Sequence, residues 1–325
     1  MSQIFKMAII AAAAFASSFL LTAVYIYVAK KQRFFPGGPD RIPSGAGLIF
    51  GICSLAAAFL FRQPGNNAVF LPAVFMLLSG ILDDIFEFTV AVKILAQIVA
   101  VALLVHSGVM LRTGAFSGAL DAPLTFIWVI GIANAFNYLD IVDGLAASIG
   151  IVSASAFSIV FIISGSFPQA ALCLALSGAL SGFIFSNYPP ARVYMGNTGS
   201  HFIGFILALS SLSSPAWPSS AANIIPAALF IVGVPVFDTA FVTLFRFFRR
   251  QPVFKKSSDH LALCLLREGF RLKDVLKIMI IVSGFLCVSG VLVSLPSVKW
   301  ISAATLLPAV FICGWLARTA VRARR

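Results

Sequence analysis

The chain has 325 residues, of which 60% are hydrophobic and only 10% are charged, and its mean hydropathy is +1.01. This composition excludes a soluble globular domain and indicates a polytopic membrane protein. The net charge of +12 does not indicate a nucleic-acid-binding protein, because the basic residues cluster at the ends of apolar segments, as expected beside an anionic leaflet.

Apolar segments that fit a membrane span recur along the whole chain. A transmembrane helix needs about 20 apolar residues, or fewer when it is tucked among neighbouring helices. The sequence therefore predicts an all-α transmembrane bundle of about eleven spans in a single integral-membrane domain, residues 1–325, since we find no internal repeat or soluble domain. The predicted spans are Ile4–Val28, Ala46–Phe61, Ala68–Leu82, Val92–Val105, Leu124–Phe136, Ala146–Ile163, Ala170–Phe185, His201–Leu212, Ile224–Phe245, Val275–Leu295 and Ile301–Ala317.

The distribution of charge along these spans predicts their orientation. Basic residues gather in the first inter-span loop, after the ninth span and at the C-terminus, so the positive-inside rule places the C-terminus in the cytoplasm and the N-terminus outside. Ten of the eleven acidic residues fall on or beside the same cytoplasmic loops, and Asp121 is the exception. Because acids contribute little to orientation, this asymmetry independently predicts an active site at the cytoplasmic face.

Two adjacent carboxylates, Asp83 and Asp84, end the third span. At the negative end of a helix dipole they repel the dipole and each other, so a nearby cation would stabilise them. The alternative is a hydrated helix end. Lys93, which opens the fourth span, is either that cation or a side chain that reaches the membrane interface.

The stretch Asn134–Leu145 contains two amides and two carboxylates, each three residues apart. On a continuous helix, Asn137, Asp140 and Asp143 would occupy about 120° of one side. The alternative is a solvated helix end or a loop between two spans. Ionisable groups at membrane depth are costly and indicate a functional site.

The segment Asn187–His201 leads into the eighth span. Two prolines stop the seventh helix, and the Gly-Asn-Thr-Gly-Ser turn offers free backbone N–H groups where the next helix starts, which suits a phosphate. Arg192 is a candidate partner for phosphate and Tyr194 for a base. His201 is interpreted as a membrane-interface residue.

The ninth span and the loop after it contain three further candidates. Asp238 lies within the span, so its charge must be paired or hydrated. Arg246 projects from the end of the span, toward lipid headgroups or a ligand. The segment Ser258–Gly269 predicts a short amphipathic helix with a serine cap and a glycine stop, on which His260 is a candidate ligand contact.

These motifs, in this order, resemble those of the polyprenyl-phosphate N-acetylhexosamine-1-phosphate transferases, the glycosyltransferase 4 family of WecA-, TagO- and WbpL-like enzymes, with MraY as a relative. The matching pieces, which span about residues 41–269, are Gly80–Asp84 with Lys93 and Gln97, Asn134–Gly144, Asn187–Ser200, Phe237-Asp238-Thr239 and Asp259-His260. The resemblance implies that a sugar 1-phosphate passes from a UDP-N-acetylhexosamine to a polyprenyl phosphate at the bacterial cytoplasmic membrane, with release of UMP. It further implies a Mg²⁺ cofactor and a role in initiating a cell-envelope glycan. The implied partners are the two substrates and the lipid bilayer, and no nucleic acid is expected. Homodimerisation stays open.

The resemblance and the residue chemistry together assign the site. The predicted catalytic residues are Asp83, Asp84, Asp140 and Asp143. The predicted substrate-binding residues are Lys93, Asn134, Asn187, Arg192, Tyr194, Gly199, Ser200, Asp238, Arg246 and His260. The predicted metal ligands are Asn137 and Asn197.

Three departures from the family pattern bear on activity. Asn197 stands where the family usually has Asp, and an amide lacks the charge that a hard cation favours. The second His of the family's Asp-His-x-x-His segment is Leu263 here, and Cys264 stands where the family has Arg. The triple-His cluster of the muramoyl-pentapeptide enzymes is absent, so that substrate is not expected.

The sequence also leaves three other functions open. Asp140-x-x-Asp143-Gly144 opens like the CDP-alcohol phosphotransferase signature, but no acid follows until Asp238. A lipid-linked sugar transporter or flippase would place polar residues at the bilayer midplane from both sides, whereas here they crowd one face. Asn197 and Leu263 motivate a catalytically degenerate, binding-only member of the family.

Overall fold

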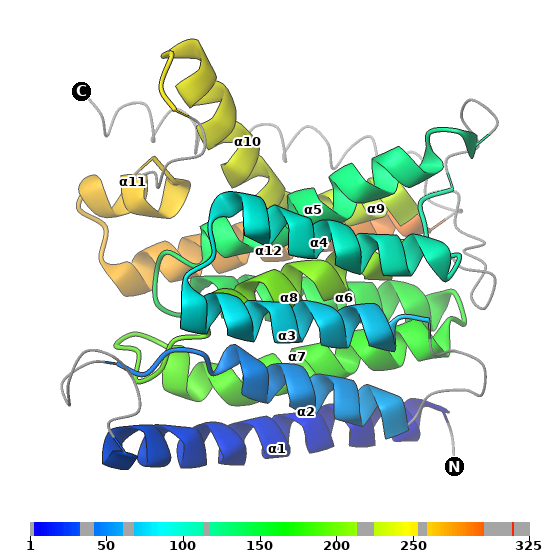
Figure 1. Ribbon diagram of the computed structural model, residues 1–325, viewed down its shortest axis with the longest axis horizontal. Coiled ribbons are helices and arrows are strands. Elements are labelled where there is room, and N and C mark those ends of the chain that lie inside the picture. Colours follow the sequence, from blue (N-terminus) through cyan, green and yellow to red (C-terminus); the bar gives the residue numbers. More distant parts are fainter. Residues whose placement is uncertain are drawn as a thin grey trace.

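The computed structural model describes residues 3–32, 42–60, 68–112, 118–212, 224–252 and 259–295, together with Gly314. Over this part of the chain the protein folds into twelve α-helices and no β-strand (Figure 1). They are α1 (Gln3–Gln32), α2 (Gly47–Leu60), α3 (Phe70–Phe86), α4 (Val90–His106), α5 (Asp121–Leu139), α6 (Leu145–Ile163), α7 (Phe167–Asn187), α8 (Gly196–Ser210), α9 (Ile224–Ile231), α10 (Gly233–Phe248), α11 (Leu261–Arg267) and α12 (Leu272–Ser294). The prediction of an all-α fold is confirmed.

The helices form the bundle of a multi-pass membrane protein. Five of them, α1, α5, α6, α7 and α12, are long and apolar enough to cross a bilayer, and α9 with α10 makes a sixth if the pair counts as one broken span. The first ten predicted spans each overlap a helix, while Ile301–Ala317 lies outside the described residues. The number of eleven spans therefore stays a prediction.

The ninth predicted span is not one straight helix. α9 and α10 meet at Val232 and bend by 78° (Figure 1). Pro235 has no N–H, so the carbonyl of Ile231 loses its usual helical donor. It accepts instead from Ser153 Oγ at 2.8 Å and from Cys287 Sγ at 3.4 Å, so the break is stabilised by α6 and α12.

α8 is the central helix, and every residue from Thr198 to Ser210 is buried. It packs against α5, α3 and α2. α2 reaches it closely because a Cβ on Gly47 would lie only 2.2 Å from the backbone nitrogen of Gly199. Small residues allow such close backbone contact between membrane helices. The contact fixes the start of α8 against α2.

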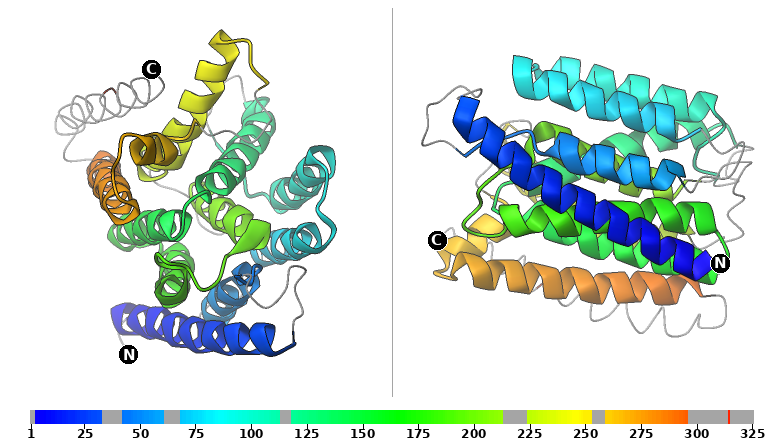
Figure 2. Two further views of the ribbon diagram at one scale, coloured as in Figure 1. Left: turned by 90° about the vertical axis from the view of Figure 1, so that its left-hand side faces the viewer. Right: turned by 90° about the horizontal axis from the view of Figure 1, so that it is seen from below.

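The polar motifs meet because of how the helices alternate. α3, α5 and α7 end, and α4, α6 and α8 begin, at the end of the bundle on the left of Figure 1, which faces the viewer in the left panel of Figure 2. Short connections join these helices there. Asp121, the one acid that was not predicted beside a cytoplasmic loop, starts α5 at the other end of the bundle. The site acid Asp140 follows the last residue of the same helix.

Candidate active site

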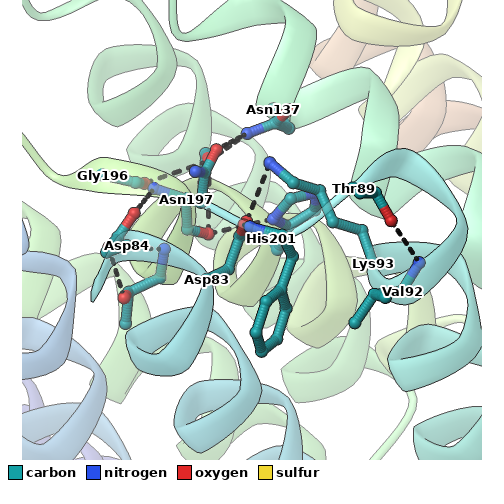
Figure 3. Close-up of polar contacts among 12 residues, drawn as sticks. Asp83, Asp84, Thr89, Val92, Lys93, Asn137, Gly196, Asn197 and His201 are labelled. Carbon is teal, nitrogen blue, oxygen red and sulfur yellow. Dashed lines mark hydrogen bonds and ion pairs between the residues drawn. The ribbon is translucent and has the colours of Figure 1, made fainter. Parts of the chain in front are cut away.

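Asp84 caps the N-terminus of α8. Its Oδ1 accepts from the Asn197 backbone N–H at 2.7 Å, and its Oδ2 accepts from the Thr198 backbone N–H at 3.1 Å and from the Thr198 hydroxyl (Figure 3). The positive end of the α8 dipole further favours this carboxylate. The expectation that these two N–H groups are free for a phosphate is therefore wrong, because a carboxylate from α3 already occupies them.

Asp83 has a different partner. Its Oδ2 lies 2.9 Å from Lys93 Nζ, and its Oδ1 accepts from the backbone N–H of Phe88 at 3.0 Å (Figure 3). Thr89 caps α4 by accepting from the Val92 N–H, which positions the first turn that carries Lys93. Of the two interpretations of Lys93, the structure favours the cation beside the carboxylates.

Amide side chains link α4, α5 and α8. Asn137 Nδ2 donates to Asn197 Oδ1 at 3.0 Å and to Ser200 Oγ at 2.9 Å. One turn earlier on α5, Asn134 Nδ2 donates to Gln97 Oε1 at 2.7 Å. Together with Asp84, these bonds bring into one cluster residues that are up to 114 positions apart in the chain.

Gly199 and Ser200 are buried parts of α8. A Cβ on Gly199 would lie 2.8 Å from Phe50 and 2.9 Å from Gly47, so this glycine permits helix packing. The Ser200 hydroxyl donates to the carbonyl of Gly196 and accepts from Asn137. In the structure Gly199 serves packing and Ser200 supports the amide cluster, and their predicted substrate contacts stay predictions.

The stretch after Asn137 is a loop and not a helix. α5 ends at Leu139, and Asp140 (φ −78°, ψ 54°) departs from helical geometry. Gly144 adopts φ +74°, which glycine tolerates best, immediately before α6 begins. The predicted common helical face for Asn137, Asp140 and Asp143 is therefore wrong, and the alternative of a loop between two spans is correct.

This loop is tied to the segment after α7. Asp143 Oδ2 accepts from the Ala191 N–H at 3.0 Å. Asn187 Oδ1 accepts from the Gly144 N–H at 3.1 Å, while its Nδ2 donates to the carbonyl of Val193 at 2.9 Å. Asn187 is buried and uses both polar groups to link the two loops, and its predicted substrate contact stays a prediction.

Asp140 differs from the other site acids in having no hydrogen-bond partner among the described residues. It is half-buried, and its carboxylate receives no hydrogen bond from the described part of the chain. Burial, and to a smaller extent the negative charges of Asp84 and Asp143, together raise the pKa of Asp140 to about 7. A cation that approached this group would favour its ionised form.

Arg192 and Tyr194 face outward beside these acids. Tyr194 is 39% exposed, and its pKa is raised first by desolvation and then by the charges of Asp143 and Asp140. Arg192 is exposed and donates through Nη2 to the carbonyl of Phe185 at 3.1 Å. Both side chains are placed where a ligand from solution can reach them.

Asp238, Arg246 and His260 form a second cluster. Asp238 is buried, and its Oδ2 lies 2.6 Å from His260 Nδ1, while its Oδ1 accepts from the Leu261 N–H at 2.7 Å. Of the two predicted states of Asp238, paired or hydrated, the structure shows the paired one. Arg246 Nε lies 3.2 Å from Asp259 Oδ2, so α10 is also joined to the start of α11.

This second cluster changes the predicted cap of α11. Asp238 satisfies the first N–H of the helix, and the predicted cap Ser258 lies outside the described residues. The glycine stop is confirmed, since Gly269 follows the helix with φ +91°. The ring centroids of His260 and Tyr138 are 6.2 Å apart, which places the cluster beside the end of α5. Ligand contacts by Asp238, Arg246 and His260 stay predictions.

The polar end of the bundle suits a magnesium ion that binds together with substrate. Among the described residues, no three His, Cys, Asp or Glu side chains are grouped so that they could hold a metal by themselves. Mg²⁺ usually takes one or two carboxylates and completes its shell with water and phosphate oxygens. The unpartnered Asp140 fits this pattern, whereas the Asn197 carbonyl oxygen is already engaged by Asn137.

Sequence reasoning missed Thr198 and His201. The Thr198 hydroxyl completes the binding of Asp84, and its only signal was its place inside the turn. His201 is 4% exposed and lies within the bundle, so its interpretation as a membrane-interface residue is wrong. Its Nδ1 lies 3.0 Å from the carbonyl of Asn197 one turn earlier, a spacing of four that a helical position predicts.

Comparison with known proteins supports the resemblance in the motifs. Residues 67–214 match the model of glycosyl transferase family 4. A probable undecaprenyl-phosphate N-acetylglucosaminyl 1-phosphate transferase of Bacillus subtilis is 27% identical over 79% of this chain and 74% of its own length. An undecaprenyl-phosphate alpha-N-acetylglucosaminyl 1-phosphate transferase of Yersinia pestis is 26% identical over 94% of this chain and 91% of its own length.

A phospho-N-acetylmuramoyl-pentapeptide-transferase of Streptococcus pneumoniae is 30% identical over 53% of this chain and 59% of its own length. The region that matches the family model, residues 67–214, contains Asp83 and Asp84 of α3, the α5–α6 loop and the start of α8. These elements build the site. Matched sequence and observed geometry therefore agree: the part of the chain that builds the site matches glycosyl transferase family 4, and the chain is similar to undecaprenyl-phosphate N-acetylglucosaminyl 1-phosphate transferases.

Proposed function

We propose that this protein transfers a sugar 1-phosphate from a UDP-N-acetylhexosamine to undecaprenyl phosphate, releases UMP and initiates a cell-envelope glycan. The observation that carries the proposal is the convergence of Asp84, Asn137 and Asn197 in one polar cluster at the end of a membrane bundle. A lipid phosphate at the membrane surface and a nucleotide from solution can meet at such a place.

We also propose how the protein is oriented in the membrane. The polar end of the bundle faces the cytoplasm, the N-terminus lies outside, the C-terminus is cytoplasmic, and eleven spans form one domain in the bacterial inner membrane. The basic residues support it, because Lys30 and Lys31 end α1 and Arg246 ends α10, as the positive-inside rule requires of cytoplasmic ends.

In this proposal the Asp83 carboxylate orients the Lys93 ammonium toward a substrate phosphate. Asp83 is not needed as a strong base, because a phosphate monoester has a second pKa near 6 and is mostly dianionic at pH 7. Its carboxylate holds Lys93 by the 2.9 Å contact, and the ammonium keeps donors for a phosphate oxygen. Arg192 and Tyr194, which face solvent, would receive the nucleotide.

We propose that Asp140 and Asp143, with the side-chain oxygen of Asn137, hold Mg²⁺ when substrate is present, while Asn197, whose side-chain oxygen accepts from Asn137, supports that residue. The ion would supply neutralisation of the diphosphate charge and so favour departure of UMP. The protein itself holds Asp140 near Asp143. It fixes the loop of Asp143 through the hydrogen bond from the Ala191 N–H, and it orients Asn197 through the hydrogen bond from Asn137.

The test is a membrane assay with undecaprenyl phosphate and a panel of UDP-N-acetylhexosamines, in which UMP release is followed with and without Mg²⁺. We expect release with one nucleotide sugar and dependence on the metal. Asp140→Asn is the test variant, and Asp121→Asn is its matched control, since both acids flank α5 at opposite ends. Silence with every nucleotide sugar would favour the degenerate member that Asn197 and Leu263 suggest.

A further inference from the structure

A small cavity lies between α3, α4 and α8, and Asp83 and Lys93 are among the residues that line it. Its volume is about 20 Å³, and its polar lining consists of Ser79, Asp83, Lys93, Gln97 and His201. One ordered water needs about 10–15 Å³ of such space, together with two to four polar partners. Figure 3 shows His201 next to Asp83 and Lys93. The cavity has room for one water.

The hydrogen bond at Nδ1 fixes the tautomer of His201. Nδ1 lies 3.0 Å from the carbonyl oxygen of Asn197, which can only accept, so Nδ1 carries the proton. A proton on the buried Nε2 would find no acceptor among the described residues. The ring is therefore neutral, and Nε2 is an acceptor.

Two buried acceptors thus face the same cavity. His201 Nε2 is enclosed and receives no hydrogen bond from the described residues. Asp83 Oδ2 is also enclosed, and its close partner is the Lys93 ammonium at 2.9 Å. Buried polar atoms are normally satisfied, and a water molecule supplies two donors at once.

We propose that one internal water occupies this cavity, donates to His201 Nε2 and to Asp83 Oδ2, and accepts an N–H from Lys93. All three neighbours are satisfied by this arrangement, and the Asp83 carboxylate is held by the Phe88 N–H on one oxygen and by Lys93 and the water on the other. His201 is then a positioning residue for the Asp83–Lys93 pair.

The consequence for turnover rests on the proposed function. Loss of the Nε2 acceptor would leave the water with one fewer partner and allow the Asp83 carboxylate to rotate. The Lys93 ammonium would then be less well oriented toward the phosphate in the transition state. Binding of the nucleotide, which takes place on the solvent side near Tyr194, would change little.

The first experiment needs no activity. The chain has three histidines, so ¹⁵N-histidine labelling gives few imidazole signals, and those of His201 are the ones that disappear in His201→Gln. We expect a protonated Nδ1 and an unprotonated Nε2, and an experimental map that resolves water should show one molecule within hydrogen-bond distance of Nε2 and Asp83. A protonated Nε2, an absent water, or direct contact of Lys93 Nζ with Nε2 would overturn the proposal.

The second experiment compares His201→Leu with His201→Gln. Leucine fills the space without an acceptor, whereas glutamine can place an amide oxygen near the Nε2 position. We expect kcat to fall roughly tenfold in His201→Leu with the KM for the UDP-sugar almost unchanged, and to fall only about twofold in His201→Gln. His106→Leu, an exposed change at the far end of α4, should have no effect.

These results separate packing from positioning. Equal losses in the two His201 variants that follow their melting temperatures would reduce His201 to a packing residue and overturn the proposal, as would wild-type kcat in His201→Leu. If His201→Leu does not fold, His201→Asn replaces it, because its shorter amide reaches only the Nδ1 position. If the wild type releases no UMP with any nucleotide sugar, the proposed function fails, but the tautomer and the water still decide this inference.

Discussion

The acids of α3 and Asp140 of the α5–α6 loop lie at the same end of the bundle but differ in the hydrogen-bond donors around them. Asp83 has an ammonium and a backbone N–H, and Asp84 has two backbone N–H groups and a hydroxyl. Asp140 has no hydrogen-bond donor among the described residues and faces two other carboxylates. The first pair is stabilised by the fold itself, whereas Asp140 is held in a position that is unfavourable for its charge.

This difference separates residues that build the site from a residue that is available to a ligand. A carboxylate that accepts helix N-terminal N–H groups cannot also face a metal with the same oxygens. A carboxylate with a raised pKa and no partner gains most when a cation arrives. Asp83 and Asp84 are adjacent in the sequence but therefore have different roles. The acid best suited to bind a metal, Asp140, lies in the α5–α6 loop.

The strongest test of this contrast is Asp140→Asn. We expect UMP release to fall roughly 100-fold or more, since removal of a single preorganised charge at a transition state has this size. The folded protein should be at least as stable at pH 8 as the wild type, because an unfavourable buried charge is removed. Asp121→Asn should keep full turnover. Unchanged turnover in Asp140→Asn would end the assignment of Asp140 to the reaction.

The next test concerns the Asp83–Lys93 pair. Lys93→Met should reduce turnover strongly and destabilise the protein by roughly 1–3 kcal/mol, because it leaves the carboxylate of Asp83 buried without its cation. The double variant Asp83→Asn with Lys93→Met should recover much of the stability in thermal unfolding but not the turnover. If Asp83→Asn regained full turnover simply at higher pH, proton abstraction would be the better account of Asp83.

Asp84→Ala tests the cap of α8. Loss of the carboxylate leaves the N–H groups of Asn197 and Thr198 without their acceptor, and an N-cap contributes about 0.5–2 kcal/mol. The melting temperature should fall by several degrees, and turnover should fall less than in Asp140→Asn. Asp84→Asn, which keeps one acceptor oxygen, should lie between alanine and the wild type. A larger loss of turnover than in Asp140→Asn would contradict the division of roles.

The smallest expected effect is a slope of stability with pH. The pKa of Asp140 is about 7 in the folded state and near 4 in the unfolded chain, so the folded state binds its proton more tightly. This contribution to stability is complete below about pH 4 and is lost as the pH rises toward 7. Thermal unfolding between pH 4.5 and 8 should show the decline in the wild type and a flatter curve in Asp140→Asn. Mg²⁺ with bound substrate should also flatten it.

Several elements were predictable because their signals are local. Apolar runs located ten helices, two prolines stopped α7 before Pro189, and Gly269 ended α11. The candidate acids and amides were also visible, since ionisable residues are rare in this composition. The local sequence could not show that Pro235 breaks the ninth span by 78°, because the partners of the freed Ile231 carbonyl come from α6 and α12.

Hydropathy and charge act on each segment independently, so they are enough to predict a membrane bundle whose acids gather at one end. The role of each polar group depends on the folded structure, because hydrogen bonds act over about 3 Å between residues far apart in the chain. The folded structure places Asp84 at the α8 N-terminus, Asn187 against the α5–α6 loop and His201 beside a cavity, and it gives Asp140 no hydrogen-bond donor from the residues that the structure describes.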